Sequence, residues 1–294
     1  MTIISASRRT DIPALYGDWF MDKIGKGGCL VANPFNGKVE RVSLALEDVN
    51  GIVFWSRNYR PMLKRLRSLN DMGYRFYCQF TIIGYPRFID PGSPAPDMSA
   101  RTARMIRESF GTRAVVWRYD PIMLTSVTDA KWHARNFTSL LEKMEGATDT
   151  CVISFIDRYR KLERNLFPLL EKRGVTYYDP ARDELENLAG QMALLAEKRG
   201  ITVESCCEPK LSAVGKTSCV DPLRLSDVAE QDLSAVRKAP TRAGCRCAYS
   251  KDIGAYDTCV LGCAYCYANN SRKRSMANRR AIKKESPGLG RSEA

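Results

Sequence analysis

The alternation of short apolar runs with amphipathic helical patterns constrains the fold of this 294-residue chain most strongly. Runs rich in β-branched and aromatic residues predict strands, and the segments between them repeat apolar residues at helical spacing. The predicted strands are TIISASRRTD, CLVANP, VERVSL, GIVFWSRN, YRFYCQFTI, RAVVWRYDP, CVISFIDR and ITVESCCEP. The predicted helices are MLKRLRSLNDMG, SARTARMIRESFG, DAKWHARNFTSLLEKMEG and DELENLAGQMALLAEKRG. Strands that alternate with helices in this way indicate a parallel sheet.

The number of these units favours an α/β fold in which residues 1–220 form a (β/α)8 barrel of the TIM type. A doubly wound open sheet is the alternative, although no G-x-G-x-x-G follows the first strand. The pair Asn36-Gly37 between CLVANP and VERVSL is typical of a hairpin turn. Beyond the barrel, the apolar periodicity fades. We expect residues 221–270 to be a cysteine-rich extension that binds an iron–sulfur cluster, and residues 271–294 to be a basic, disordered tail.

The chain has eleven cysteines and a single histidine. Its N-terminal segment lacks the pattern of a signal peptide, and no window is apolar enough to span a membrane, so we expect a cytoplasmic protein with reduced thiols and no membrane partner. Most cysteines lie after residue 205, and this asymmetry indicates metal binding through sulfur. The isolated Cys29, Cys78 and Cys151 fall in apolar strands, so we expect them in the core, and we expect His133 to be structural.

The segment CVLGCAYCYANN places Cys259, Cys263 and Cys266 in a C-x-x-x-C-x-x-C spacing. A zinc site takes four ligands, usually as two separated pairs, so a zinc site here would have to borrow a fourth thiol. Three thiolates on a cubane iron–sulfur cluster leave one iron open to a small molecule. The spacing therefore favours a [4Fe-4S] cluster, with a structural zinc site as the alternative.

Four further cysteines form a second set, namely Cys207, Cys219, Cys245 and Cys247. They supply enough thiolates for a second [4Fe-4S] cluster or for a zinc site, and the sequence favours iron and sulfide. Cys206 is an alternative to Cys207, because neighbouring residues of a strand point to opposite faces.

Cys259, Cys263 and Cys266, with the aromatic Tyr265 before the last of them, resemble the signature of radical S-adenosylmethionine (SAM) enzymes. The resemblance implies a β/α barrel and a [4Fe-4S] cluster whose fourth iron binds SAM and cleaves it to a 5′-deoxyadenosyl radical. In ordinary members of that superfamily the motif follows the first strand, whereas here it lies near the C-terminus.

A wider resemblance runs through most of the chain. Its segments SASRRTDIPA, NPFNGKV, IVFWSRN, QFTI, WRYDPIMLT, CVISFID and DIGAYDTCVLGCAYCYANN are similar to the bacterial domain-of-unknown-function family 1848. This resemblance implies no particular reaction.

Polar residues, many of them arginines, follow the predicted strands, and the net charge is +13. In a parallel barrel these strand ends surround the active site, so they predict a mouth for an anion. Five of these residues are candidates for binding SAM, through its carboxylate, ammonium or ribose groups, or for binding an anionic substrate. They are Arg8, Arg9, Asp11, Arg57 and Glu204. Candidate catalytic residues are Arg118, Tyr119 and Asp120, with Tyr119 as a donor of a hydrogen atom.

The leading hypothesis is a radical SAM enzyme that acts on an anionic substrate and receives electrons from a partner such as flavodoxin or ferredoxin. A nucleic-acid-acting repair lyase similar to spore photoproduct lyase is an alternative, which the basic tail favours. A zinc-stabilised binding protein without catalysis is the other alternative. The proline-rich residues 89–99 are either a lid or a plain connection.

Overall fold

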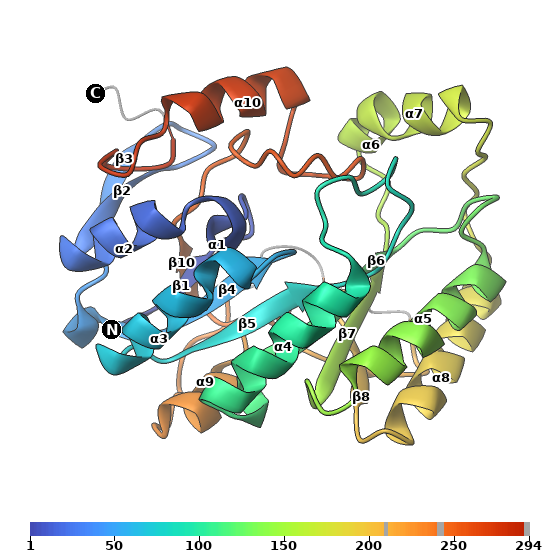
Figure 1. Cartoon of the computed structure of the whole chain (residues 1–294), viewed down its shortest axis with the longest axis horizontal. Coiled ribbons are helices and arrows are strands. Elements are labelled where there is room, and N and C mark those ends of the chain that lie inside the picture. The colour runs from blue at the N-terminus through green and yellow to red at the C-terminus, as the bar shows by residue number, and fades with distance from the viewer. Residues whose placement is uncertain (209–210, 240–243, 291–294) are drawn as a thin grey trace.

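The computed structural model describes residues 1–208, 211–239 and 244–290. Eight strands form one sheet in the order β10-β1-β4-β5-β6-β7-β8-β9, and every neighbouring pair is parallel (Figure 1). The strands are β1 (Thr2–Ala6), β4 (Val49–Ser56), β5 (Phe76–Thr81), β6 (Val115–Ile122), β7 (Thr150–Phe155), β8 (Thr202–Ser205), β9 (Gly215–Lys216) and β10 (Ser250–Asp252).

The predicted hairpin is present but lies outside this sheet. Strands β2 (Gly28–Ala32) and β3 (Val39–Ser43) pair with each other in antiparallel register. Gly37 in the connecting turn has φ of +72°, a value that glycine adopts without the steric cost of a Cβ atom. Two of the eight strands that the sequence predicted for the barrel therefore belong elsewhere, and β9 and β10 take their places.

The structure confirms an α/β fold with a parallel sheet, but it does not show a closed barrel. The sheet ends at β9 and β10, and no pairing among the described strands joins these two edges. A TIM barrel closes by pairing its first strand with its last. Here β1 pairs with β10, but β10 forms one edge of the sheet and is not joined to β9 at the other edge among the described strands.

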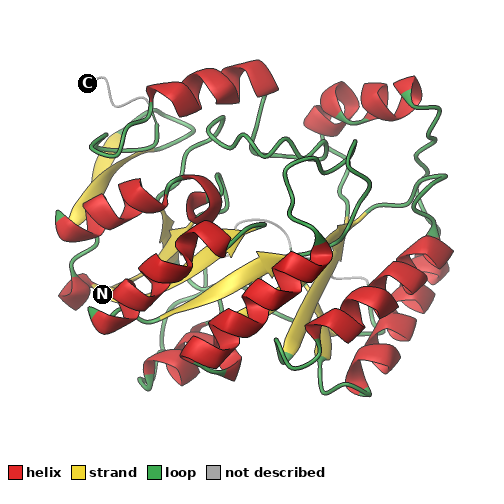
Figure 2. Ribbon diagram, in the orientation of Figure 1, coloured by secondary structure: helices red, strands yellow, loops and turns green. Residues whose placement is uncertain are grey.

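Helices flank the sheet, and most of them cover one of its faces, while the helix that follows β9 packs on the other (Figure 2). They are α1 (Ile12–Leu15), α2 (Gly17–Gly25), α3 (Leu63–Asp71), α4 (Pro96–Phe110), α5 (Ala130–Met144), α6 (Arg160–Asn165), α7 (Phe167–Lys172), α8 (Arg182–Glu197), α9 (Pro222–Ala229) and α10 (Arg272–Ala281). Short 3-10 turns are Leu46–Asp48, Arg60–Met62 and Thr112–Ala114. Strand β6 shows the alternation of faces: Trp117 and Tyr119 pack among the helices, whereas Val116 and Arg118 point to the other face.

The other face of the sheet is filled by the chain after β8. Val53, Val116 and Val152 from three strands pack there against Leu225 of α9 and the nearby Val220. Several cysteines belong to the same buried group. This segment occupies the space that the predicted barrel would have enclosed, and it contributes β10 to the sheet. The predicted boundary at residue 220 therefore does not separate a sheet from an independent extension.

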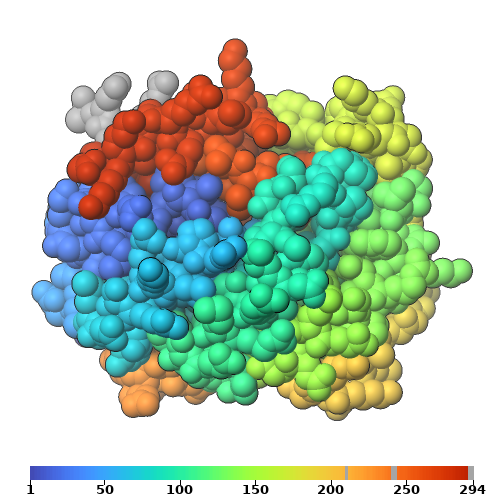
Figure 3. Space-filling model, viewed as in Figure 1, coloured from blue at the N-terminus to red at the C-terminus, as the bar shows by residue number. Residues whose placement is uncertain are grey.

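The expectation of a disordered tail is wrong for residues 271–290. Ser271 caps the N-terminus of helix α10, where its hydroxyl accepts a hydrogen bond from the backbone N–H of Arg274. The following segment packs on the N-terminal part of the chain, where the indole of Trp19 donates to the carbonyl of Ser286 at 2.9 Å. In Figure 3 this red segment lies directly against the blue one. The basic residues that suggested disorder are surface residues of a docked helix.

Among helices of the described residues, none has both the length and the apolar composition that crossing a bilayer requires.

Candidate metal centre

The loop of residues 254–270, which we call the triad loop, carries Cys259, Cys263 and Cys266 between β10 and α10. Its contacts come from residues that follow the C-terminal ends of four strands: Tyr16 after β1, Arg57 after β4, Asp90 after β5 and Tyr159 after β7. The triad loop therefore crosses the edge of the sheet where parallel α/β proteins bind their ligands (Figure 1).

Hydrogen bonds from the sheet fix the backbone of the triad loop. The hydroxyl of Tyr16 donates to the carbonyl of Thr258 at 2.6 Å, and the hydroxyl of Tyr159 donates to the carbonyl of Tyr265. Each of these aromatic side chains supplies a donor to a loop that lacks regular structure. The positions of the three thiols are thus set by the sheet.

The proline-rich residues 89–99 form the second support of the triad loop. The carbonyl of Ile89 accepts the N–H of Ala264 at 2.9 Å. A Cβ atom at Gly92 would collide with the backbone of Leu261, so only glycine allows this close approach. The sequence did not decide whether this segment is a lid or a plain connection. In the structure it packs directly against the triad loop.

Backbone amides point at two of the three sulfur atoms. The sulfur of Cys259 accepts from the N–H groups of Asp11 and Leu261, and the sulfur of Cys266 accepts from those of Ala268 and Asn269. Hydrogen bonds to ligand sulfurs are one of the means by which proteins tune iron–sulfur clusters. The amides around the triad fit sulfur atoms that carry negative charge.

Burial raises the pKa of all three triad thiols, and that of Cys259 reaches about 12. Without a metal these thiols are protonated at neutral pH, because removal from water disfavours the charged thiolate. A coordinated metal ion deprotonates a thiol outright. Cys263 interacts electrostatically with both other triad thiols, and no hydrogen bond joins two triad sulfurs among the described residues.

Asp11 lies beside Cys259, but its carboxylate is occupied. One oxygen accepts from the hydroxyl of Ser56 at 2.7 Å and from the N–H of Ala14 at 3.0 Å, and the other accepts from the N–H of Arg57 at 2.9 Å. Burial raises the pKa of Asp11 to about 6. This predicted cofactor ligand caps α1 and joins the ends of β1 and β4, so it positions the triad.

Arg57 and Asp90 form a buried ion pair next to Cys263. The hydroxyl of Tyr265 donates to the same carboxylate at 3.2 Å, and the guanidinium of Arg57 lies 5.2 Å from the centre of the Tyr265 ring. The aromatic residue of the cysteine motif thus locks the loop onto this ion pair. Asp90 was missed at the sequence level, because it lies in a proline-rich connection without a motif.

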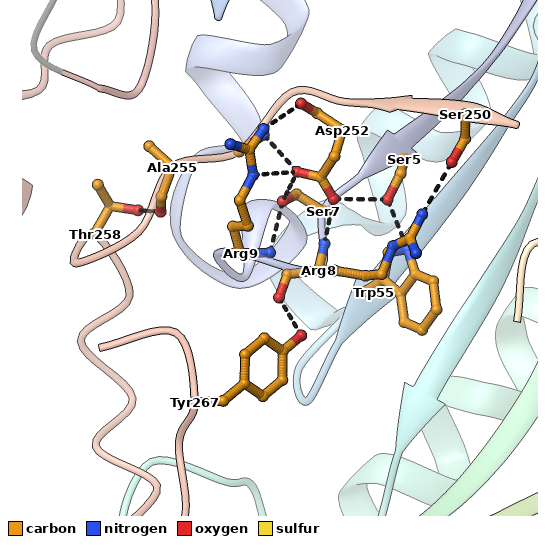
Figure 4. A network of polar contacts seen from close by, with 11 residues as sticks. Ser5, Ser7, Arg8, Arg9, Trp55, Ser250, Asp252, Ala255, Thr258 and Tyr267 are labelled. Carbon is orange, nitrogen blue, oxygen red and sulfur yellow. Dashed lines mark hydrogen bonds and ion pairs between the residues drawn. The ribbon is translucent and has the colours of Figure 1, made fainter. Parts of the chain in front are cut away.

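The two predicted arginines after β1 differ in their partners (Figure 4). Arg9 pairs with Asp252 of β10 at 3.0 Å, and the hydroxyl of Ser7 donates to the same carboxylate at 2.6 Å. Arg9 therefore joins β1 to β10 through this ion pair, and its binding of an anion stays a prediction. Arg8 donates to the neutral hydroxyl of Ser250 at 2.9 Å, and its guanidinium lies 5.7 Å from the ring centre of Trp55.

Arg118 and Asp120 form an ion pair on the inner face of the sheet. Arg118 also donates to the side-chain oxygen of Gln79 at 3.3 Å, and its guanidinium lies 5.3 Å from the ring centre of Trp55. Arg8 and Arg118 therefore both lie against Trp55. The triad loop reaches the same place, because the hydroxyl of Tyr267 donates to the carbonyl of Arg8.

Tyr119 points away from this region, so the prediction that it donates a hydrogen atom there is wrong. Its hydroxyl lies 2.8 Å from Nδ1 of His133, on the face that the helices cover. The Nε2–H of His133 donates to the carbonyl of Met123 at 3.0 Å, which leaves Nδ1 to accept from the tyrosine. Burial lowers the pKa of His133 to about 4, and its structural role is confirmed. The buried positions of Cys29, Cys78 and Cys151 are confirmed as well.

Glu204 lies in a different cavity of about 200 Å³ on the inner face. Thr150 and Thr202, the first residues of β7 and β8, line this cavity together with Arg224. The cavity therefore extends toward the N-terminal ends of the strands, whereas the triad lies at the C-terminal ends. The structure does not place Glu204 with the other predicted cofactor ligands.

The second cysteine set comes together, with Cys206 as an additional member. We call these five residues the thiol cluster: Cys206, Cys207, Cys219, Cys245 and Cys247. The sulfur of Cys206 lies 2.8 Å from that of Cys219 and 3.7 Å from that of Cys207. Hydrogen bonds from the thiols of Cys206 and then Cys247 hold the pKa of Cys219 below its usual value. Cys206 faces inward, whereas the sequence did not decide whether Cys206 or Cys207 would do so.

Within residues 1–208, 211–239 and 244–290, no three His, Cys, Asp or Glu side chains surround a common ion position. The fit of the triad to a cluster therefore rests on its three sulfur donors, their amide partners and their place at the sheet edge. These features fit a [4Fe-4S] cluster, because each thiolate binds a different iron and the three need not share one ion.

A family profile matches residues 3–268, which is most of the chain, and its description is domain of unknown function, DUF1848. The chain belongs to this family. No curated protein matches the chain in a sequence search.

Proposed function

We propose that the protein is a radical SAM enzyme in which Cys259, Cys263 and Cys266 hold a [4Fe-4S] cluster. The observation that carries this proposal is the triad loop itself: three thiols on one irregular segment, fixed across the C-terminal edge of a parallel sheet. When bound, such a cluster supplies the electron that cleaves SAM and starts radical chemistry.

The residues around the triad have supporting roles. The amides of Leu261, Ala268 and Asn269 direct N–H groups at the sulfurs and stabilise their negative charge. The ion pair of Arg57 and Asp90 orients Tyr265 and excludes water on the side of Cys263. Exclusion of water suits radical chemistry, because it prevents side reactions.

Arg8 is the residue that we propose for the anionic part of SAM or of the substrate. Its guanidinium donates to a serine hydroxyl, while the neighbouring Arg9 takes the carboxylate of Asp252. The carbonyl of Arg8 binds Tyr267, which immediately follows the last triad cysteine. Arg8 is thus both close to the triad and able to form a bidentate pair with a carboxylate or phosphate. An external donor of the flavodoxin or ferredoxin class would supply the electron, in a reducing cytoplasm.

The test is anaerobic purification followed by reconstitution with iron and sulfide. We expect visible charge-transfer absorbance, about four iron and four sulfide per chain, and 5′-deoxyadenosine when SAM and a reductant are added. Cys263→Ser should lose iron, sulfide and SAM cleavage together. Cys29→Ala is the matched control, because Cys29 lies apart from the triad in β2, and it should keep all three.

Two results would contradict the proposal. Zinc without iron or sulfide in the anaerobic protein would favour a zinc-stabilised binding protein. Iron and sulfide that survive in Cys263→Ser would show that the triad is not their ligand set.

A nucleic-acid substrate is the second candidate, because α10 is a folded and basic surface helix. Arg272, Lys273 and Arg280 are exposed on it. If the substrate is DNA or RNA, affinity should fall steeply with added salt, and an Arg272→Gln/Lys273→Gln variant should reduce both affinity and salt dependence. Affinity that is independent of salt would exclude this candidate.

A further inference from the structure

We propose that the thiol cluster binds one zinc ion in tetrahedral coordination and that this ion fastens the C-terminal third of the chain to the sheet. This inference goes beyond the proposed function and does not rest on it, because the thiol cluster shares no ligand with the triad. Cys206, Cys219 and Cys247 are the expected core of the ligand set, since Cys219 is hydrogen-bonded to both others. Cys207 or Cys245 supplies the fourth thiolate.

The spacing of the sulfur atoms favours one ion over a cubane. With zinc–sulfur bonds of about 2.3 Å, the edge of a tetrahedron of sulfurs is roughly 3.8 Å. The sulfurs of Cys206 and Cys207 are 3.7 Å apart, and those of Cys206 and Cys219 are 2.8 Å apart. Among the described residues no three of these sulfurs already surround one ion position, so the closer pair would have to separate by about 1 Å to admit an ion. A cubane would require all these sulfurs to move much farther apart.

The backbone of Cys207 is the second observation. Its φ of +59° is a left-handed value that costs about 1 kcal/mol for a residue with a Cβ atom. In a regular strand Cys206 and Cys207 would point to opposite faces. The left-handed turn brings both thiols to the same side, within 3.7 Å. Strain of this kind persists where a functional arrangement requires it.

Hydrogen-bond donors directed at the sulfurs are the third observation. The N–H of Val220 donates to Cys247 at 3.4 Å, and the N–H of Cys247 donates to Cys245 at 3.5 Å. Arg118, a buried cation, donates to Cys219 at 3.2 Å. Four thiolates around a divalent zinc ion carry net negative charge, and a buried guanidinium offsets part of it. Arg118 is thus a positioning residue of this site.

The proposed ion would join three separate segments of the chain. Cys206 and Cys207 follow β8, Cys219 precedes α9, and Cys245 and Cys247 precede β10. Because β10 leads directly into the triad loop, the ion would hold the entry of that loop against the sheet. Metal binding of this kind contributes directly to folding.

The test measures zinc, iron and sulfide in the same anaerobically purified full-length samples. We expect about one zinc per chain in the wild type and in Cys263→Ser, and a loss of zinc in Cys219→Ser and Cys247→Ser. Single Cys207→Ala and Cys245→Ala variants identify the fourth ligand, because only one of them should lose zinc. The iron count reports on the triad independently, so failure of this inference and failure of the proposed function are distinguishable.

Cobalt substitution keeps the inference testable if a cysteine variant does not fold. Co²⁺ in the wild-type protein should show the d–d bands of a tetrahedral site and strong thiolate-to-cobalt charge transfer. Absence of zinc from the wild type, zinc retained in Cys219→Ser, or cobalt without thiolate charge transfer would each overturn the inference. Iron and sulfide that only Cys219→Ser removes would also overturn it, because they would indicate a second cluster.

Discussion

The triad loop and the thiol cluster are both built from cysteines on irregular backbone, yet they differ in the surroundings of their sulfurs. In the triad, amides approach two sulfurs and the three thiols do not bond to one another. In the thiol cluster, Cys206 and Cys219 are in direct contact and a guanidinium approaches one of them. This difference is the reason for the two separate proposals: sulfurs in direct contact favour a single ion, whereas thiols without such contact favour a cluster.

The largest expected effect concerns Arg118. Arg118→Gln removes the cation beside Cys219 and leaves Asp120 without its buried partner, so we expect a loss of about 3–5 kcal/mol in the free energy of unfolding. Zinc affinity should fall by roughly 10–100-fold, whereas iron binding at the triad should be unchanged. Denaturant titration and metal analysis measure the two quantities. Arg158→Gln is the control: its pair with Asp179 is exposed, and it should cost less than about 1 kcal/mol.

Equal loss of zinc and iron in Arg118→Gln would show that the two sites are not separate.

Acid should destabilise the fold through His133, which belongs to neither site. Its pKa of about 4 lies below the unfolded value of about 6.5, so the unfolded chain binds the proton first as the pH falls. We expect the free energy of unfolding to drop by about 3 kcal/mol between pH 6.5 and pH 4. His133→Gln should flatten this dependence in urea titrations. Parallel pH curves for wild type and variant would refute the assignment.

Gly92→Ala tests the triad loop alone. The added methyl group meets the backbone of Leu261, so we expect a cost of about 1–3 kcal/mol and weaker iron incorporation, with zinc unchanged. Thermal unfolding and metal counts measure both effects. At Gly190 of α8 the nearest atom to a new methyl group is 3.7 Å away, so Gly190→Ala should be neutral or stabilising. Iron incorporation at the wild-type level in Gly92→Ala would refute the close packing.

The smallest effect is expected for Tyr265→Phe. It removes one hydrogen bond to Asp90, while Arg57 keeps its pairing, so the cost should be about 1 kcal/mol. The stability of the reconstituted cluster toward chelators should fall slightly. Tyr256→Phe, at an exposed ring, should leave both measurements unchanged. A variant more stable than the wild type would show that the hydroxyl does not stabilise the loop.

The strands and helices that the sequence predicted are those with clear periodicity. Strand β6 is an example, because alternate residues meet the helices and the inner face. The two-residue β9 and the three-residue β10 are too short to carry a period, so the open sheet could not be foreseen. Helix α10 was missed because it is held by contacts with distant residues, such as those of Arg279 with Leu15 and Tyr16, whereas its own composition is polar.

The candidate site was only partly visible in the sequence for a similar reason. The spacing of the cysteines predicts a metal site, but the sequence does not predict which residue an arginine will contact, because the fold determines that. Arg9 and Arg8 are adjacent in the chain, yet one meets Asp252 and the other meets Ser250, because β10 lies beside β1. Tyr119 likewise follows Arg118 and points to the opposite face. Sequence reasoning can identify the strand end but cannot assign each polar residue to a contact.

The pairing of β1 with β10 has a consequence for biosynthesis. One of the two neighbours of β1 is translated long after it, since Ser5 and Asp252 are 247 residues apart. The carboxylate of Asp252, which binds Ser5, Ser7 and Arg9, is therefore translated long after these residues. The triad loop follows it directly. Under the proposed function, iron and sulfide could therefore be loaded only after β10 and the triad loop have been translated.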